Sequence, residues 1–373
     1  RGAAADRARA LGAHERSIGS REEALGLSDE DDDSQRMPIE EAILEIGVTV
    51  GRHAFVVERA RAVRERYLAH GDGEGVARAT TWEGLALVND GRPMDAVATL
   101  SAGLQHAGGE IGSAATARLA AELARAHLMS GEFPEALQII EATLPVAERL
   151  DLRAVIAEIL ASKGWALSEH GRTQEAAALF LGAIALSERE GVFNAECRAR
   201  MNLSAWWAAE GPAMAFSIAR EGHERALARG DMGWALSLFG NASSTALVLG
   251  DWDWIRSAMS GLEPDYHKGI SSYFAMGAIL DMLAAQGDFD AVRNLLAEMR
   301  GALDGRADPQ IGLILAAAEA QIMLAEGSAA KVAEATPQAE SGWFSDWDSA
   351  LEIWCRAAAW SGKRNLLIDA LTL

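Results

Sequence analysis

The stretch KGWALSEHGRTQEAAALF, residues 163–180, decides the fold of this chain. A small residue, Gly164, stands seven positions before Gly171, and Ala176 stands five positions after it. Because glycine tolerates the left-handed backbone that commonly ends a helix, Gly171 predicts a turn between two helices. A small side chain beside such a turn lets the two helix backbones approach closely. The stretch therefore predicts an antiparallel helix pair.

The turn glycine recurs at a nearly constant step. Successive steps of 39, 40, 40, 40, 40, 39, 37, 40 and 35 residues separate Gly12, Gly51, Gly91, Gly131, Gly171, Gly211, Gly250, Gly287, Gly327 and Gly362. Seven positions before the glycine, small residues predominate: Ala5, Gly84, Ala124, Gly164, Ser204, Ser243 and Ala320, with Leu44 and Leu280 as exceptions. Phe133, Trp252 and Phe289 follow the glycine by two positions, where we expect a ring to close the end of the pair. This period predicts one helix pair per repeat.

Composition also favours an all-α chain. Of the 373 residues, 50% are apolar, 6% are aromatic and only 8 are prolines, a helix-forming composition. Apolar residues recur at helical spacing, as in Ala176, Phe180 and Ala183. One pair cannot bury such faces alone, so neighbouring pairs must stack. We therefore expect a helical solenoid, organised as a single repeat domain over residues 1–373.

Residues 163–176, 131–136 and 287–291 resemble units of the tetratricopeptide repeat (TPR). The usual TPR step is about 34 residues, and the longer step here is similar to the TPR-like arrays of bacterial signalling proteins that carry a STAND-class ATPase. Such arrays follow the ATPase and accompany a LuxR-type DNA-binding domain or an adenylate cyclase domain. The resemblance implies a right-handed superhelical solenoid of about nine to ten antiparallel helix pairs, belonging to a larger regulator.

Charge and cysteine usage argue against several classes of function. With 34 Lys and Arg against 54 Asp and Glu, the net charge is −20, so phosphate backbones and anionic lipids repel the chain. We expect no direct contact with nucleic acid or membrane. Cys197 and Cys355 are the only cysteines, which favours a reducing cytoplasm.

The sequence contains no recognisable catalytic or cofactor motif. Residues 108–113 are glycine-rich but lack the lysine of a phosphate-binding loop, and the 8 histidines do not have metal-ligand spacing. We therefore expect no metal, no cofactor and no enzymatic activity. A glycosidase built as an α/α toroid stays a distant alternative, because such enzymes also stack helix pairs and use acidic residues. The acidic run at residues 29–33 predicts a solvated, mobile loop, with a weak cation site as the alternative.

In solenoids of this type the first helix of each pair lines the concave face, which usually holds the ligand. Counting back from each glycine by helical spacing gives six candidate binding residues: Arg78, Arg118, Arg125, Glu158, Trp165 and Arg198. Arginine binds carboxylates and phosphates with two parallel hydrogen bonds, which predicts an acidic peptide or protein, or a small anionic effector. The alternative is that these arginines pair with neighbouring Glu and Asp.

Tryptophans concentrate in two regions of the sequence. One contains Trp206, Trp207, Trp234, Trp252 and Trp254, and the other contains Trp343, Trp347, Trp354 and Trp360. Packing in the core is favoured over a ligand platform or a self-association surface. The favoured function is a non-catalytic protein-interaction scaffold in a bacterial signalling or transcriptional regulator, and a small-molecule sensor arm is the second hypothesis.

Overall fold

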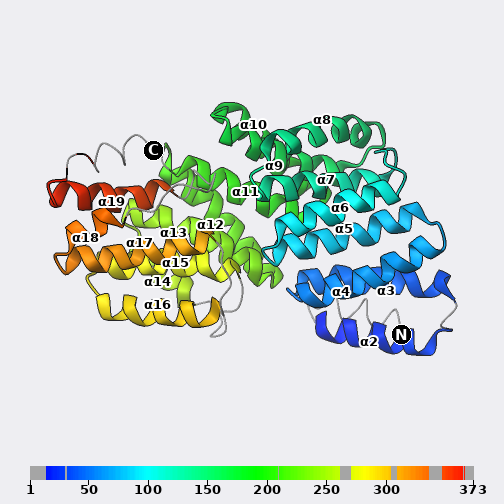
Figure 1. The fold of residues 1–373 in the computed structure, drawn as a ribbon, viewed down its shortest axis with the longest axis horizontal. Coiled ribbons are helices and arrows are strands. Elements are labelled where there is room, and N and C mark those ends of the chain that lie inside the picture. Colours follow the sequence, from blue (N-terminus) through cyan, green and yellow to red (C-terminus); the bar gives the residue numbers. More distant parts are fainter. Residues whose placement is uncertain are drawn as a thin grey trace. The chain divides into compact units, whose positions relative to one another are not determined.

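The computed structural model describes residues 14–29, 32–208, 210–260, 270–303, 309–335, 347–363 and 365, and every regular element in them is a helix (Figure 1). The helices are α2 (His14–Leu27), α3 (Asp33–Thr49), α4 (His53–Ala69), α5 (Gly73–Asn89), α6 (Pro93–His106), α7 (Ala114–Met129), α8 (Phe133–Arg149), α9 (Arg153–Glu169), α10 (Thr173–Glu190), α11 (Phe193–Trp207), α12 (Pro212–Arg229), α13 (Met232–Leu249), α14 (Trp252–Ser260), α15 (Ile270–Ala285), α16 (Phe289–Leu303), α17 (Pro309–Ala325), α18 (Ala329–Glu334) and α19 (Trp347–Trp360). The prediction of an all-α fold is therefore confirmed. Within these residues no helix is both long enough and apolar enough to cross a membrane.

Helices α3–α18 follow one another as eight pairs in the described part of the chain, each with an odd-numbered first helix and an even-numbered second helix. The two helices of a pair pack along each other, as α9 does with α10. First helices of neighbouring pairs also pack side by side, as α5 does with α7 and α7 with α9. Contacts restricted to a pair and its neighbours are those of a repeat solenoid, so this prediction is confirmed as well.

The chain divides into two compact units. Unit 1 comprises Arg1–Ala199 and Ala228–Asp231, and unit 2 comprises Arg200–Leu227 and Met232–Leu373. In unit 1, helices α3–α7 share a core that includes Leu44, Leu87 and Leu100. In unit 2, helices α12–α15 share a core that includes Phe239 and Ile279. The single repeat domain over residues 1–373 stays a prediction.

The glycine turns confirm the repeat. Positive φ values between 69° and 79° occur at Gly51, Gly91, Gly131, Gly171, Gly250, Gly287, Gly327 and Gly362. Gly12 lies outside the described residues. Gly211 is an exception without positive φ, because Pro212 begins α12 and a residue before proline is driven towards extended backbone.

A second set of turns lies about halfway between these glycines, at the joints between successive pairs. Gly71, Gly191 and Gly230 have φ near 70°, and Asp151 has φ of 53°. Asp151 is the one residue other than glycine with positive φ in the described chain. Aspartate tolerates this conformation better than most residues, and here its Oδ1 accepts a hydrogen bond from Arg153 Nε at 2.9 Å. Each helix with its turn therefore takes about 20 residues, half of the repeat period.

Close backbone approach beside the turn is also confirmed. A Cβ atom added to Gly164 in α9 would lie 2.8 Å from Cε1 of Phe180 in α10. At Gly84 in α5, the added Cβ would lie 2.5 Å from Leu100 Cδ2 in α6. Phe180 and Leu100 are both fully buried and cannot move aside without disturbing the core. These glycines are therefore required by packing.

We predict that Gly164→Ala lowers the free energy of unfolding by about 1–3 kcal/mol, because overpacking against Phe180 outweighs the better helix propensity of alanine. Gly182→Ala is the matched control. Gly182 lies in α10, is exposed and has no atom within 4 Å of an added Cβ. This control should gain about 0.5–1 kcal/mol. Urea denaturation followed by circular dichroism measures both, and equal effects would contradict the packing argument.

Candidate functional site: an arginine cluster on the first-helix face

Four of the predicted binding residues occupy one repeat position. Arg78, Arg118, Glu158 and Arg198 are spaced by 40 residues and lie on α5, α7, α9 and α11. Since α5 packs beside α7 and α7 beside α9, equivalent positions form a row across these helices, and Arg198 of α11 continues it through a hydrogen bond to Glu158 of α9. All four residues belong to unit 1. We call the surface that these residues share the first-helix face.

Three arginines of the first helices, two from this face and Arg125 beside them, lie around one glutamate. Arg118, Arg125 and Arg198, here named the arginine cluster, all interact electrostatically with the Glu158 carboxylate. Glu122, one turn from Arg118 on α7, also acts on Glu158. Burial, together with the negative charge of Glu122, raises the pKa of Glu158. The ionised form of this carboxylate is thus less favourable than usual, even with three arginines near it.

Two members of the arginine cluster are held by short polar contacts. Arg125 forms an ion pair with Glu122 at 3.3 Å and donates to Asn89 Oδ1 at 2.9 Å. Arg198 donates through Nη2 to the Glu158 backbone carbonyl at 2.7 Å. Burial and the nearby charge of Arg125 lower the pKa of Arg198. The two guanidinium groups are therefore fixed in positions where they repel each other.

Arg198 Nε and the Arg118 guanidinium, the other donors of the arginine cluster, lack short polar contacts of this kind among the described residues. Arg198 Nε is buried and has no hydrogen-bond partner among the described residues. The exposed Arg118 places its guanidinium 5.2 Å from the centre of the Trp82 ring, a cation–π arrangement. Within the described chain, no carboxylate lies at ion-pair distance from Arg118. The exposed Arg118 therefore retains donors that an oxyanion could accept from.

Arg78 and Trp165 make local contacts of their own. Arg78 forms an ion pair with Glu41 at 2.9 Å, and Tyr67 donates to the same carboxylate at 2.5 Å. Burial and the bond to Glu41 raise the pKa of Tyr67 to about 12. Trp165 donates through Nε1 to Glu169 at 3.2 Å. The alternative prediction, that these arginines pair with neighbouring Glu and Asp, thus holds fully for Arg78 and in part for Arg125.

Sequence reasoning missed three residues of this site: Glu122, Asn89 and Trp82. A signal was present for Glu122, which stands four positions after Arg118 and three before Arg125, on the same side of one helix. Asn89 and Trp82 lie on the neighbouring first helix, α5. They reach the cluster because α5 and α7 pack side by side, and finding them from sequence requires the register between the two helices.

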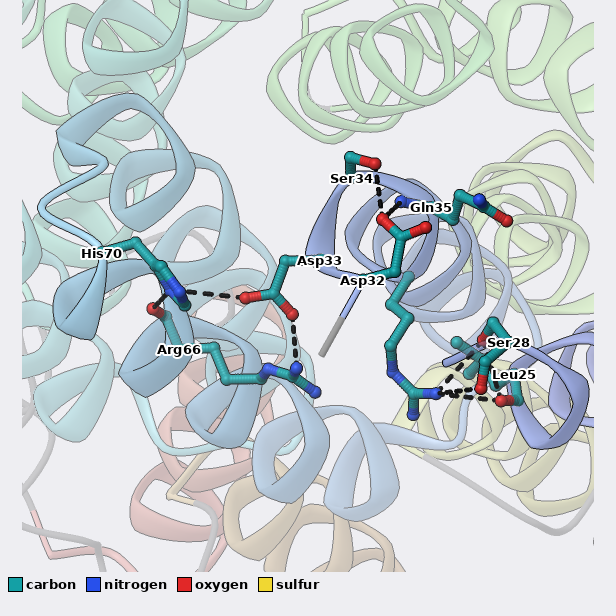
Figure 2. Close-up of polar contacts among 9 residues, drawn as sticks. Leu25, Ser28, Asp32, Asp33, Ser34, Gln35, Arg66 and His70 are labelled. Carbon is teal, nitrogen blue, oxygen red and sulfur yellow. Dashed lines mark hydrogen bonds and ion pairs between the residues drawn. The ribbon is translucent and has the colours of Figure 1, made fainter. Parts of the chain in front are cut away.

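The acidic run at residues 29–33 ends as a helix cap (Figure 2). Asp32 is the N-cap of α3, and its Oδ1 accepts hydrogen bonds from Gln35 N at 3.3 Å and Ser34 Oγ at 2.6 Å. These bonds, the one to Ser34 most strongly, lower the pKa of Asp32. Glu30 and Asp31 lie outside the described residues. The prediction of a loop is therefore wrong at the end of the run, because capping draws it into α3.

Asp33 is the first residue of α3 and pairs with the end of α4. Figure 2 shows its carboxylate between Arg66, with which it forms an ion pair, and His70, whose Nδ1 lies 3.3 Å away. Oδ1 thus faces the Arg66 guanidinium, and Oδ2 faces the His70 ring. Among the residues that the structure describes, no group of three or more His, Cys, Asp or Glu side chains could hold a metal ion.

The tryptophans divide between core and surface. In unit 2 the ring of Trp254 lies 5.1 Å from that of Phe216 and 5.9 Å from that of Phe239, between packed helices. Trp354 is buried, whereas Trp360 is 64% exposed. Trp343 and the side chain of Trp347 lie outside the described residues. Packing thus accounts for Trp254 and Trp354 without a ligand.

Unit 2 has its own polar row on first helices, at the same 40-residue step. Asn241 of α13 donates to the Met201 carbonyl of α11 at 2.9 Å, and Gln321 of α17 donates to Asp281 Oδ1 of α15 at 3.0 Å. Asp281 has no cationic partner among the described residues. Burial raises the pKa of Asp281 to about 6, against the opposing effect of the Gln321 hydrogen bond.

We predict that Asp281→Asn stabilises the protein at neutral pH by about 2–3 kcal/mol, because a pKa raised to about 6 makes the charged form of this carboxyl costly to bury. The carboxyl contributes full stability below its unfolded pKa and loses it as the pH rises through about 6. The variant and the wild type should therefore be equally stable near pH 4 and should separate as the pH rises. Urea denaturation across this pH range measures the free energy of unfolding of both proteins. A difference between them that does not change with pH would contradict the prediction.

Comparison with known proteins adds no assignment to this geometry. No family model matches the chain, and no curated protein matches it in sequence. The likeness to TPR-like regulators rests on the repeat segments themselves.

Proposed function

We propose that this chain is a non-catalytic interaction scaffold, the repeat arm of a cytoplasmic bacterial signalling or transcriptional regulator, and that its first-helix face binds an acidic protein segment. The observation that carries the proposal is the arginine cluster around Glu158. A repeat solenoid presents one long surface built from equivalent positions, which suits an extended protein segment. The resemblance to regulator arrays supplies the cellular setting of the proposal.

The charge of the cluster is opposite to that of the chain. Three arginines face two glutamates there, whereas the whole chain has a net charge of −20. Elsewhere on the surface an acidic partner is repelled, so like charges restrict its approach to this face. Arginine is suited to this role because its planar group donates two parallel hydrogen bonds to a carboxylate. Charge complementarity therefore favours an acidic segment.

A small-molecule site is less well supported. A cavity of about 360 Å³ lies near α2, α3 and α4 and is lined by residues that include Arg36 and Arg59. Both arginines are already bonded: Arg36 donates to the Leu25 carbonyl at 2.9 Å, and Arg59 pairs with Glu40 at 2.5 Å. The arginine cluster, by contrast, has in Arg118 an exposed guanidinium with no acid at ion-pair distance among the described residues, and neither arginine of the cavity is exposed in this way.

Glycoside hydrolysis is also less well supported, although Glu122 and Glu158 form a pair of nearby carboxylates. A glycosidase uses such a pair to transfer protons and to attack a neutral sugar. Here three arginines face the pair, and a neutral sugar has no charge for them to bind. We therefore favour anion binding over hydrolysis at this face.

We predict that Arg118→Glu combined with Arg125→Glu weakens binding of a labelled polyglutamate peptide by about tenfold or more. The reversal removes two donors and adds repulsion at the centre of the proposed site. Fluorescence anisotropy at low salt measures the dissociation constant, and binding should weaken further as salt is added.

The matched control is Arg172→Glu combined with Arg256→Glu. Both are exposed arginines that do not belong to a first helix, each paired with an acid three positions away, and the change in net charge is the same. The control should bind the peptide nearly as well as the wild type. Equal losses in the two double variants would show that only net charge matters, and an unchanged dissociation constant in the first would overturn the proposal.

A further inference from the structure

Glu158 is negatively charged, whereas the equivalent residues of its row are arginines. At this repeat position the neighbouring first helices have Arg118 on one side and Arg198 on the other. Glu158 therefore places a carboxylate in a row of guanidinium groups. Its neighbours do not form a closed ion pair with it, since Arg198 donates instead to the Glu158 backbone carbonyl. The carboxylate thus stands near three cations with its charge only loosely compensated.

The charged groups that face Glu158 come from two helices. They are Glu122, Arg118 and Arg125 from α7 and Arg198 from α11. The other helices packed on α9 direct charge to other residues of it. Glu141 of α8 pairs with Lys163 at 2.5 Å, and Glu190 of α10 pairs with Arg153 at 3.2 Å. The local balance therefore depends on the arginine cluster and the two carboxylates alone.

Resting on the proposed function, we propose that the Glu158 carboxylate is a built-in competitor of the acidic partner, and that it yields the arginine cluster to the partner by taking one proton from solvent. An incoming carboxylate would otherwise stand beside both Glu158 and Glu122, and like charges at short range repel. Protonation removes one of these negative charges while leaving the guanidinium donors free for the partner. Apart from this proton transfer, no covalent bond of the site changes.

The direction of the pH effect follows from this exchange. Burial and Glu122 already raise the pKa of Glu158, and a bound anion raises it further. Partner affinity should therefore increase as the pH falls towards the pKa of Glu158 and level off below it. His53 is a second titratable group near the cluster, since it interacts with Arg125, and burial lowers its pKa. The Glu158→Gln variant separates the effect of His53 on affinity from that of Glu158.

The decisive variant is Glu158→Gln, which keeps the shape of the side chain and removes its charge. At neutral pH it should bind the polyglutamate peptide several-fold more tightly than the wild type, and the gap should narrow as the pH falls. Titration calorimetry in buffers of different ionisation enthalpy should show proton uptake on binding by the wild type in excess of that by the variant. Any pH dependence left in Glu158→Gln belongs to His53 or to the peptide.

The control is Glu141→Gln, which removes the same charge from α8 and should leave affinity near that of the wild type. Circular dichroism confirms that each variant is folded. If Glu158→Gln binds no better than the wild type while the double arginine reversal abolishes binding, the competitor role is overturned and the proposed function stands. If the peptide binds neither the wild type nor Glu158→Gln, the proposed function fails and the competitor role fails with it.

Discussion

The close approach of two helix backbones beside a left-handed glycine turn is the constraint on which the rest of this structure depends. At Gly164 there is no room for even a methyl group against Phe180. This contact fixes how far α10 lies from α9, and the turn at Gly171 fixes where the chain reverses. The close approach and the turn recur together at a step near 40 residues, which keeps equivalent side chains in register from pair to pair.

The candidate site is a product of that register. Arg118 and Arg198 are 80 residues apart in sequence, yet both act on Glu158 because three first helices present the same position. Distances within the cluster therefore depend on backbone packing rather than on any local sequence motif. The same logic gives unit 2 its row of amide and carboxyl groups, including the hydrogen bond from Gln321 to Asp281. One repeat thus supports two faces of different chemistry.

Much of the fold could be predicted from the sequence, because glycine and small residues mark turns and close contacts directly. The left-handed backbone of Asp151 could not, since an aspartate in this conformation has no compositional signal. Gly211 was misjudged because its neighbour, Pro212, dictates its conformation. For the site, helical spacing suggested Arg118 and Arg198 as residues of the first helices. The partnership of Arg125 with Asn89 depends on contacts between helices that spacing within one helix does not reveal.

The regular spacing of the turns also determines which changes of length the chain tolerates. One residue inserted inside a first helix turns every later side chain by about 100° around the helix axis and removes it from the row. Insertions in the turn regions leave the helical faces aligned. Gain or loss of a complete 40-residue unit also leaves the remaining rows intact. Duplication and deletion of whole repeats are therefore the routes by which such an array can lengthen or shorten while keeping its surface chemistry.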